Sequence, residues 1–166
     1  RHGTALERHG RIERSTIRIA EREVHLARPH AYMNESGAPV AAEARRLRLH
    51  RPQLLVVYDE LDLPTGHVRL RLAGGHGGNR GMRSVISALG GENIPRVRIG
   101  IDRPYDDGVP VRDPDRIADW VLSRPSRDER TLLNAAIERA ADAIELAAFE
   151  GVEVAMRQLN SNTDMD

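Results

Sequence analysis

The chain has 166 residues, of which 40% are hydrophobic and 30% charged, as expected for one globular domain with a sizeable core. Its formal net charge is zero, and it has no cysteine, which excludes disulfides, thiolate nucleophiles and cysteine-based zinc sites. No apolar run is long enough to span a bilayer and no secretory signal is recognisable, so we expect a cytoplasmic protein.

The first part of the chain alternates between β and α patterns. Loosely alternating β-branched and apolar residues predict a β-hairpin over residues 12–19 and 23–28, with its turn near residues 20–22. Helical spacing over residues 35–49 predicts a helix, with Asn34 or Ser36 as its N-cap. The continuous apolar strand at residues 53–58 is typical of the middle of a parallel sheet that is covered on both faces.

The rest of the chain repeats this alternation. We predict strands at residues 67–72 and 96–101, a glycine loop at 74–78, a loop at 104–114, helices at 79–89, 113–122, 127–150 and 152–159, and a frayed end at 160–166. The pattern predicts a single α/β domain over residues 1–166, with a mixed, largely parallel sheet flanked by helices.

Three acidic residues, Asp59, Glu60 and Asp62, follow the apolar strand. Ligand sites in open α/β sheets form outside the carboxyl ends of the strands. A carboxylate there can orient a histidine, three acids together can hold Mg²⁺, and a solvated loop is the simplest alternative. A metal-dependent hydrolase or nucleotide enzyme that uses Asp59, Asp62 and His76 is a further hypothesis.

The glycine loop, Gly74-Gly75-His76-Gly77-Gly78, opens onto a predicted helix. Backbone amides at a helix start bind anions, and glycines let backbone approach a ligand closely. The loop lacks the Lys-Ser/Thr ending of a P-loop, so it is a weak nucleotide motif. His76 is interpreted as a structural residue of the loop.

Arginine supplies all 25 basic residues of the chain. Residues 1–104 hold 18 Arg and 11 acidic residues, a difference of +7, whereas residues 105–166 hold 7 Arg and 14 acidic residues, a difference of −7. Two pairs spaced by two residues project to one face of their strands: Arg69 with Arg71, and Arg96 with Arg98. They form a candidate phosphate-binding face, and exposed edge strands would explain them equally well.

Tyr32-Met33-Asn34 lies at a strand-to-helix junction, where an aromatic ring can stack on a base and an amide can bind substrate. By itself this string is explained as well by a buried tyrosine and a helix N-cap asparagine.

Together these strings resemble the bacterial-type peptidyl-tRNA hydrolase family. Order and spacing agree from about residue 5 to residue 158. The matching strings are Leu26-Ala27-Arg28-Pro29, Tyr32-Met33-Asn34-Glu35-Ser36-Gly37, Asp59-Glu60-Leu61-Asp62-Leu63-Pro64 with Gly66, Gly74-Gly75-His76-Gly77-Gly78 with Gly81, Arg96-Val97-Arg98-Ile99-Gly100-Ile101 with Arg103-Pro104, and Trp120-Val121-Leu122-Ser123.

The resemblance implies an enzyme that hydrolyses the ester joining a peptide to the 3′ ribose of tRNA, as a monomer and without a metal or other cofactor. In the family a histidine acts as general base on water, and Asp59 matches the aspartate that orients it. The resemblance also assigns substrate contacts to Tyr32, Asn34 and Asn79, and phosphate contacts to Arg71 and Arg98. A gap-free match puts Arg80 where the family has its substrate-binding asparagine, so Asn79 or Arg80 serves that role.

The family's first strand, its Gly-Leu-Gly-Asn-Pro-Gly turn and its Thr-Arg-His-Asn string have no counterpart in the 166 residues. Arg1-His2-Gly3 is similar to part of the last string, but it lies much too close to Asn34. We therefore expect an N-terminally truncated domain that lacks the catalytic histidine and is nearly inactive and poorly stable on its own. The alternative is a non-catalytic RNA-binding relative of the same fold.

Overall fold

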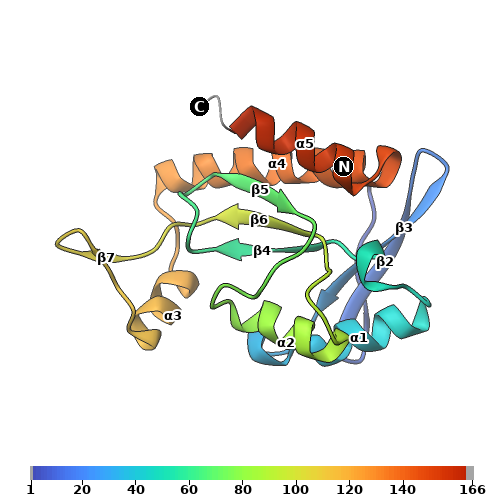
Figure 1. Cartoon of the computed structure of the whole chain (residues 1–166), viewed down its shortest axis with the longest axis horizontal. Helices are drawn as coiled ribbons and strands as arrows, with labels where there is room; N and C mark the ends of the chain where they lie inside the picture. Colours follow the sequence, from blue (N-terminus) through green and yellow to red (C-terminus); the bar gives the residue numbers. More distant parts are fainter. Residues whose placement is uncertain (1, 164–166) are drawn as a thin grey trace.

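A computed structural model describes residues 2–163 of the chain. Within these residues the strands form three separate sheets, in the orders β1-β2-β3, β4-β6-β5 and β7-β8. Figure 1 shows the sheet β4-β6-β5 as a central layer, with α1 and α2 on one side and α4 and α5 on the other. This layering confirms the mixed α/β class.

The first sheet is an antiparallel meander. It consists of β1 (Glu7–His9), β2 (Ile12–Ile19) and β3 (Arg22–Pro29), and the β2–β3 pair confirms the predicted hairpin. Its tight turn places Ala20 and Glu21 at φ 44° and 66°. Two successive positive φ values match the right-handed twist of the flanking strands, although these two residue types rarely adopt them.

The central sheet combines the two pairing modes. Strand β6 (Arg96–Gly100) pairs in parallel with β4 (Val56–Glu60) and antiparallel with β5 (Val68–Arg71). The sequence predicts a largely parallel sheet with the apolar strand in its middle. Over residues 2–163, however, β4–β6 is the one parallel pair and β4 is an edge strand.

The two faces of the central sheet pack against different helices. Val68, Leu70 and Val97 lie in one core cluster with alanines of α4 (Arg127–Glu150) and with residues of α5 (Val152–Thr163). The opposite face packs Val56 and Tyr58 against residues of α2. Alternation along the strands therefore decides which side chains reach α2 and which reach α4.

The outer edge of β5 is held by a side chain rather than by another strand. Asn160 accepts a hydrogen bond from the Leu70 backbone N–H at 3.1 Å and donates one to the Leu70 carbonyl at 3.1 Å. Its amide thus replaces one residue of a neighbouring strand and covers the edge. Helix α5 runs to Thr163, four residues past its predicted end at residue 159. The predicted fraying of residues 160–166 stays a prediction, and residues 164–166 lie outside the described residues.

The helical layer below the sheet begins with a short 3₁₀ helix, η1 (Met33–Glu35), followed by α1 (Gly37–Arg46) and α2 (Arg80–Leu89). Ser36 occupies the N-cap position of α1 without a side-chain cap. Helices α1 and α2 pack closely, and the Gly37 N–H donates to the Ser84 Oγ at 2.9 Å. A β-carbon on Gly37 would lie 2.1 Å from the Ser84 carbonyl oxygen, so only glycine fits here.

The substitution Gly37→Ala is therefore expected to lower the free energy of unfolding by about 3 kcal/mol, the upper end of the usual cost of overpacking. The clash is with backbone, which cannot rotate away as a side chain can. Urea denaturation monitored by circular dichroism measures the change. Gly75→Ala is the matched control, because its nearest atom, Glu92 Oε1, lies 3.7 Å away. Equal stability of the two variants would contradict this account of α1–α2 packing.

Helix α3 (Pro114–Leu122), followed by α4 and α5, confirms the predicted order of the last three helices. Three of the remaining elements, all short, were not predicted: η2 (Arg51–Gln53), β7 (Tyr105–Asp106) and β8 (Val109–Pro110). The stretch predicted as a loop at 104–114 contains the small β7–β8 hairpin. Ser126 and Glu129 form a capping box that starts α4. Among residues 2–163, no helix is long and apolar enough to span a membrane.

Candidate functional site

Asp59 lies near the carboxyl end of β4 and is half-buried. Burial raises the pKa of its carboxyl, the nearby charge of Glu60 raises it further, and its own backbone N–H acts in the opposite direction. Among residues 2–163, no side chain forms a hydrogen bond or ion pair with the Asp59 carboxylate. A half-buried acid without a partner costs stability, which suggests that the position serves function rather than folding.

The neighbouring acids are engaged by arginines. Glu60 is buried and accepts a hydrogen bond from the Arg98 Nε at 2.8 Å, and it also caps the Asp62 backbone N–H at 3.1 Å. Asp62 forms an ion pair with Arg103. The carboxylate oxygens of Glu60 and Asp62, which the magnesium hypothesis needs as ligands, therefore already have hydrogen-bonding or ion-pair partners. No group of three or more His, Asp or Glu side chains in the described part of the chain is placed to hold a metal ion.

The glycine loop is held by Arg96, which is only 2% exposed. Its guanidinium donates to the carbonyls of Gly75 at 2.9 Å, Glu92 at 3.1 Å and Ile94 at 3.1 Å. Within the loop, His76 Nδ1 accepts a hydrogen bond from the Gly78 N–H at 3.0 Å. The structural interpretation of His76 agrees with this contact. The role of Arg96 was missed, because its alternation with Arg98 predicted an exposed basic face.

Asn79 connects the glycine loop to both α2 and β4. As the N-cap of α2, its side-chain oxygen accepts from the Met82 N–H at 2.9 Å. Its amide nitrogen donates to the Asp59 carbonyl at 3.4 Å. Because both ends of its amide have structural partners, Asn79 is poorly placed to bind substrate. The next residue, Arg80, is exposed and lines an open groove.

This groove has a volume of about 680 Å³ and separates η1 and the start of α1 from α2. Asn34 lines one wall and Arg80 the other, so the structure brings these two predicted residues together. Met33 lies against Gly81, where a β-carbon would be 2.4 Å from the Met33 sulfur. Tyr32 is 80% exposed, which contradicts the alternative of a buried tyrosine.

The four arginines of the predicted phosphate face do share one face of the central sheet. Register places Arg69 opposite Arg98 and Arg71 opposite Arg96. Their environments differ, however, since Arg96 holds the glycine loop and Arg98 pairs with Glu60. Arg71 is exposed and has no acidic partner among the described residues.

The hydrogen bonds and ion pairs that histidine side chains form within residues 2–163 go to groups other than Asp59. His2 Nε2 lies 3.0 Å from Glu145 Oε1 on α4, and His25 Nδ1 lies 3.0 Å from the Thr16 hydroxyl. Within residues 2–163, no imidazole forms a hydrogen bond or ion pair with the Asp59 carboxylate. His2 is therefore not the partner of Asp59, in agreement with its exclusion on spacing.

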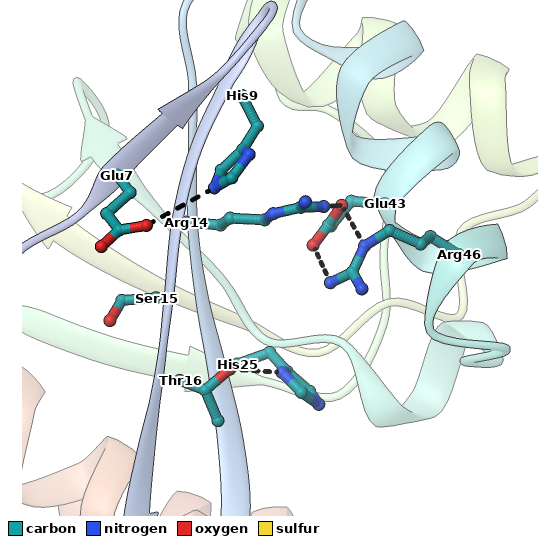
Figure 2. A pocket seen from close by; sticks show the side chains of 8 residues that line it. All are labelled: Glu7, His9, Arg14, Ser15, Thr16, His25, Glu43 and Arg46. Carbon is teal, nitrogen blue, oxygen red and sulfur yellow. Dashed lines mark hydrogen bonds and ion pairs between the residues drawn. The ribbon is translucent and has the colours of Figure 1, made fainter.

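A second cavity, of about 360 Å³, lies between the β1-β2-β3 sheet and α1, and it contains none of the predicted site residues. Figure 2 shows Arg14 and Arg46 converging on Glu43, with His9 and His25 at the sides. Arg46 donates to both Glu43 oxygens, at 3.0 and 2.6 Å, and Arg14 donates at 3.1 Å. The hydrogen bond from Arg46 is the main cause of a lowered pKa of Glu43. This ion-pair cluster fastens α1 to β2, and sequence reasoning did not identify it.

Comparison with known proteins places this geometry in a family. A sequence model described as peptidyl-tRNA hydrolase matches residues 1–166. The chain is 46% identical over 143 residues to the peptidyl-tRNA hydrolase of Nocardia farcinica. The aligned region covers 86% of this chain and 70% of that protein. For the enzyme of Mycolicibacterium smegmatis the identity is 42% over 163 residues, or 97% and 82% of the two chains.

A solved structure shows the same fold. The crystal structure of peptidyl-tRNA hydrolase from Acinetobacter baumannii superposes with a TM-score of 0.86 at 30% sequence identity. The match covers 96% of this chain and 78% of that chain.

Proposed function

The chain belongs to the peptidyl-tRNA hydrolase family, and we propose that it hydrolyses the ester bond between peptide and tRNA by a water attack that Asp59 assists. The observation that carries this mechanism is the half-buried Asp59 carboxylate, which has no side-chain partner within residues 2–163. Such a carboxylate can accept the N–H of a histidine, fix its tautomer and stabilise its charged form after it removes a proton from water.

The substrate contacts are proposed on the same geometry. Asn34 faces the groove from η1, and its amide can donate to and accept from the peptide or ribose next to the ester. Exposed Tyr32 can stack on the terminal base. Asn79 remains a candidate through its family position, although its cap and its bond to the Asp59 carbonyl favour a positioning role.

Arg71 and Arg98 are proposed as the contacts to tRNA phosphate. Exposure and the lack of an acidic partner within the described residues support Arg71. The Arg98 guanidinium donates to Glu60 through its Nε. This bond would fix the direction in which its remaining N–H groups point toward a phosphate.

We further propose a monomer that acts in the cytoplasm without a metal. The substrate arises from translation, and the carboxylates of Glu60 and Asp62 are paired with arginines rather than left for a cation. Size-exclusion chromatography with light scattering tests the oligomeric state. Unchanged hydrolysis after treatment with a chelator tests the metal requirement.

The hydrolysis proposal is tested with N-acetyl-aminoacyl-tRNA, by measuring the free tRNA that the 166-residue chain releases. Because no imidazole forms a hydrogen bond or ion pair with the Asp59 carboxylate within residues 2–163, we expect slow release that rises when imidazole is added to the buffer. Fast release without imidazole would show that the chain supplies its own base. RNA binding with no release above buffer, with or without imidazole, would favour the non-catalytic RNA-binding relative.

A further inference from the structure

We propose that Arg80 and Arg83 bind the backbone phosphates of the single-stranded 3′ end of tRNA within the groove between η1 and α2. The inference rests on the proposed function and names the part of the substrate that this groove receives. It differs from the Arg71 and Arg98 assignment, because those residues lie on the central sheet and outside the groove.

The groove carries a positive charge that is not neutralised. Arg11, Arg80 and Arg83 line it, and Glu35 is its single acidic lining residue. Glu35 forms an ion pair with Arg11, which offsets that one charge. Arg80 and Arg83 are exposed and have no acidic partner among residues 2–163, so two cations remain available for an anionic ligand.

Folding does not explain these two arginines. The first turn of α2 contains no acidic residue, and cations in the first turn of a helix are disfavoured by about 0.3–1 kcal/mol each. Neither side chain contributes to the core of the layer, which Met82 and Val85 form on the other face of the helix. Their positions are three residues apart, so both project along the groove wall.

The groove also lies next to the proposed reaction centre. Asn79, which directly precedes Arg80, donates to the Asp59 carbonyl at 3.4 Å, and Asn34 lines the opposite wall. A nucleotide strand whose 3′ ester lies at Asp59 would place its last phosphates along α2. Peptide is the less suitable occupant, because nascent peptides vary in charge whereas phosphates are always negative.

The test measures binding of fluorescein-labelled single-stranded RNA ending in the tRNA 3′ sequence, by fluorescence anisotropy across a salt series. Arg80→Gln and Arg83→Gln are each expected to reduce the slope of log K against log[salt] by about 0.7. If parent and variant bind equally at 1 M salt, this change in slope makes each variant bind about fivefold more weakly than the parent at 0.1 M salt. Glutamine keeps helix propensity, so folding should be unchanged and is checked by circular dichroism.

Arg157→Gln is the matched control, because Arg157 is exposed on α5, on the opposite side of the central sheet (Figure 1). The proposal is overturned if Arg80→Gln and Arg83→Gln bind RNA like the parent chain, or if Arg157→Gln weakens binding equally. If the two variants bind RNA like the parent but have a raised KM for peptidyl-tRNA, the groove would instead be assigned to the peptide. If the variants bind RNA more weakly but the parent chain does not hydrolyse the ester, the assignment of the groove to RNA stands and the hydrolase mechanism is rejected. The failure of this proposal and the failure of the proposed function are therefore distinguishable.

Discussion

Asp59→Asn is expected to lower kcat for hydrolysis of peptidyl-tRNA by about 10²–10⁴-fold, the usual contribution of general-base catalysis. Asparagine has nearly the same shape, but it cannot stabilise an imidazolium and can hold the ring in the wrong tautomer. KM should change little, because Asn34 and the groove arginines are not altered. Rates are compared at a saturating concentration of imidazole, since no imidazole forms a hydrogen bond or ion pair with the Asp59 carboxylate within residues 2–163.

The same substitution should stabilise the fold at neutral pH. Burial raises the pKa of Asp59 in the folded protein above its unfolded value. The protonated form therefore stabilises the fold below the unfolded pKa of about 3.9, and this stability is lost as the pH rises through the folded pKa. At pH 7 the variant avoids burying a charge and should melt at a higher temperature than the parent, and the two should converge in acid.

Asp62→Asn serves as the control for Asp59→Asn, because it makes the same chemical change three residues further along the chain. Asp62 is half-exposed in an ion pair with Arg103, and such pairs contribute at most about 1 kcal/mol. Its kcat should stay within a few-fold of the parent. An Asp59→Asn protein that is both inactive and less stable at pH 7 would indicate damage to the fold and would remove the support for a catalytic Asp59.

The sequence predicted the elements whose signals are local. The β2–β3 hairpin follows from alternation, and Asn79 and Gly90 bound α2 as an N-cap and a left-handed C-cap. The end of the apolar run also placed Asp59 near the carboxyl end of its strand, although β4 continues through Asp59 to Glu60. Each of these depends on neighbouring residues, so patterns in the chain are sufficient to find them.

The misses depend on contacts between distant residues. An apolar run such as residues 54–58 has the same appearance in a central strand and in an edge strand, so the place of β4 in the sheet was not predictable. Arg96 and Arg98 have the same spacing pattern, yet one is buried among carbonyls and the other pairs with Glu60. Alternation gives the face of a side chain, and it does not say what covers that face.

Arg96→Met is expected to lower the free energy of unfolding by about 1–3 kcal/mol. The loss follows from the carbonyls that Arg96 serves, since a buried acceptor left without a donor costs about 1–3 kcal/mol. The Glu92 carbonyl also accepts from the N–H groups of Gly74 and Ile94, so it remains satisfied. The carbonyl of the buried Ile94 depends on Arg96, whereas Gly75 is exposed and its carbonyl can bind water instead, which limits the expected cost to one buried acceptor.

The loss should be concentrated in the glycine loop. Without Arg96, the loop retains the bond from the Gly74 N–H to Glu92 but loses its tie at Gly75, so amide hydrogens of residues 74–79 should exchange faster than those of β6. Arg96→Lys should recover only part of the stability, because a single ammonium cannot reach three carbonyls that the planar guanidinium contacts together.

Arg71→Met is the matched control for stability, because Arg71 lies directly opposite Arg96 in the β5–β6 register but is exposed. Its free energy of unfolding should change by less than about 0.5 kcal/mol. Equal stability of Arg96→Met and Arg71→Met in urea denaturation would mean that the loop holds its shape without the buried arginine. The position of Asn79 beside Asp59 would then have to follow from the α2 cap alone.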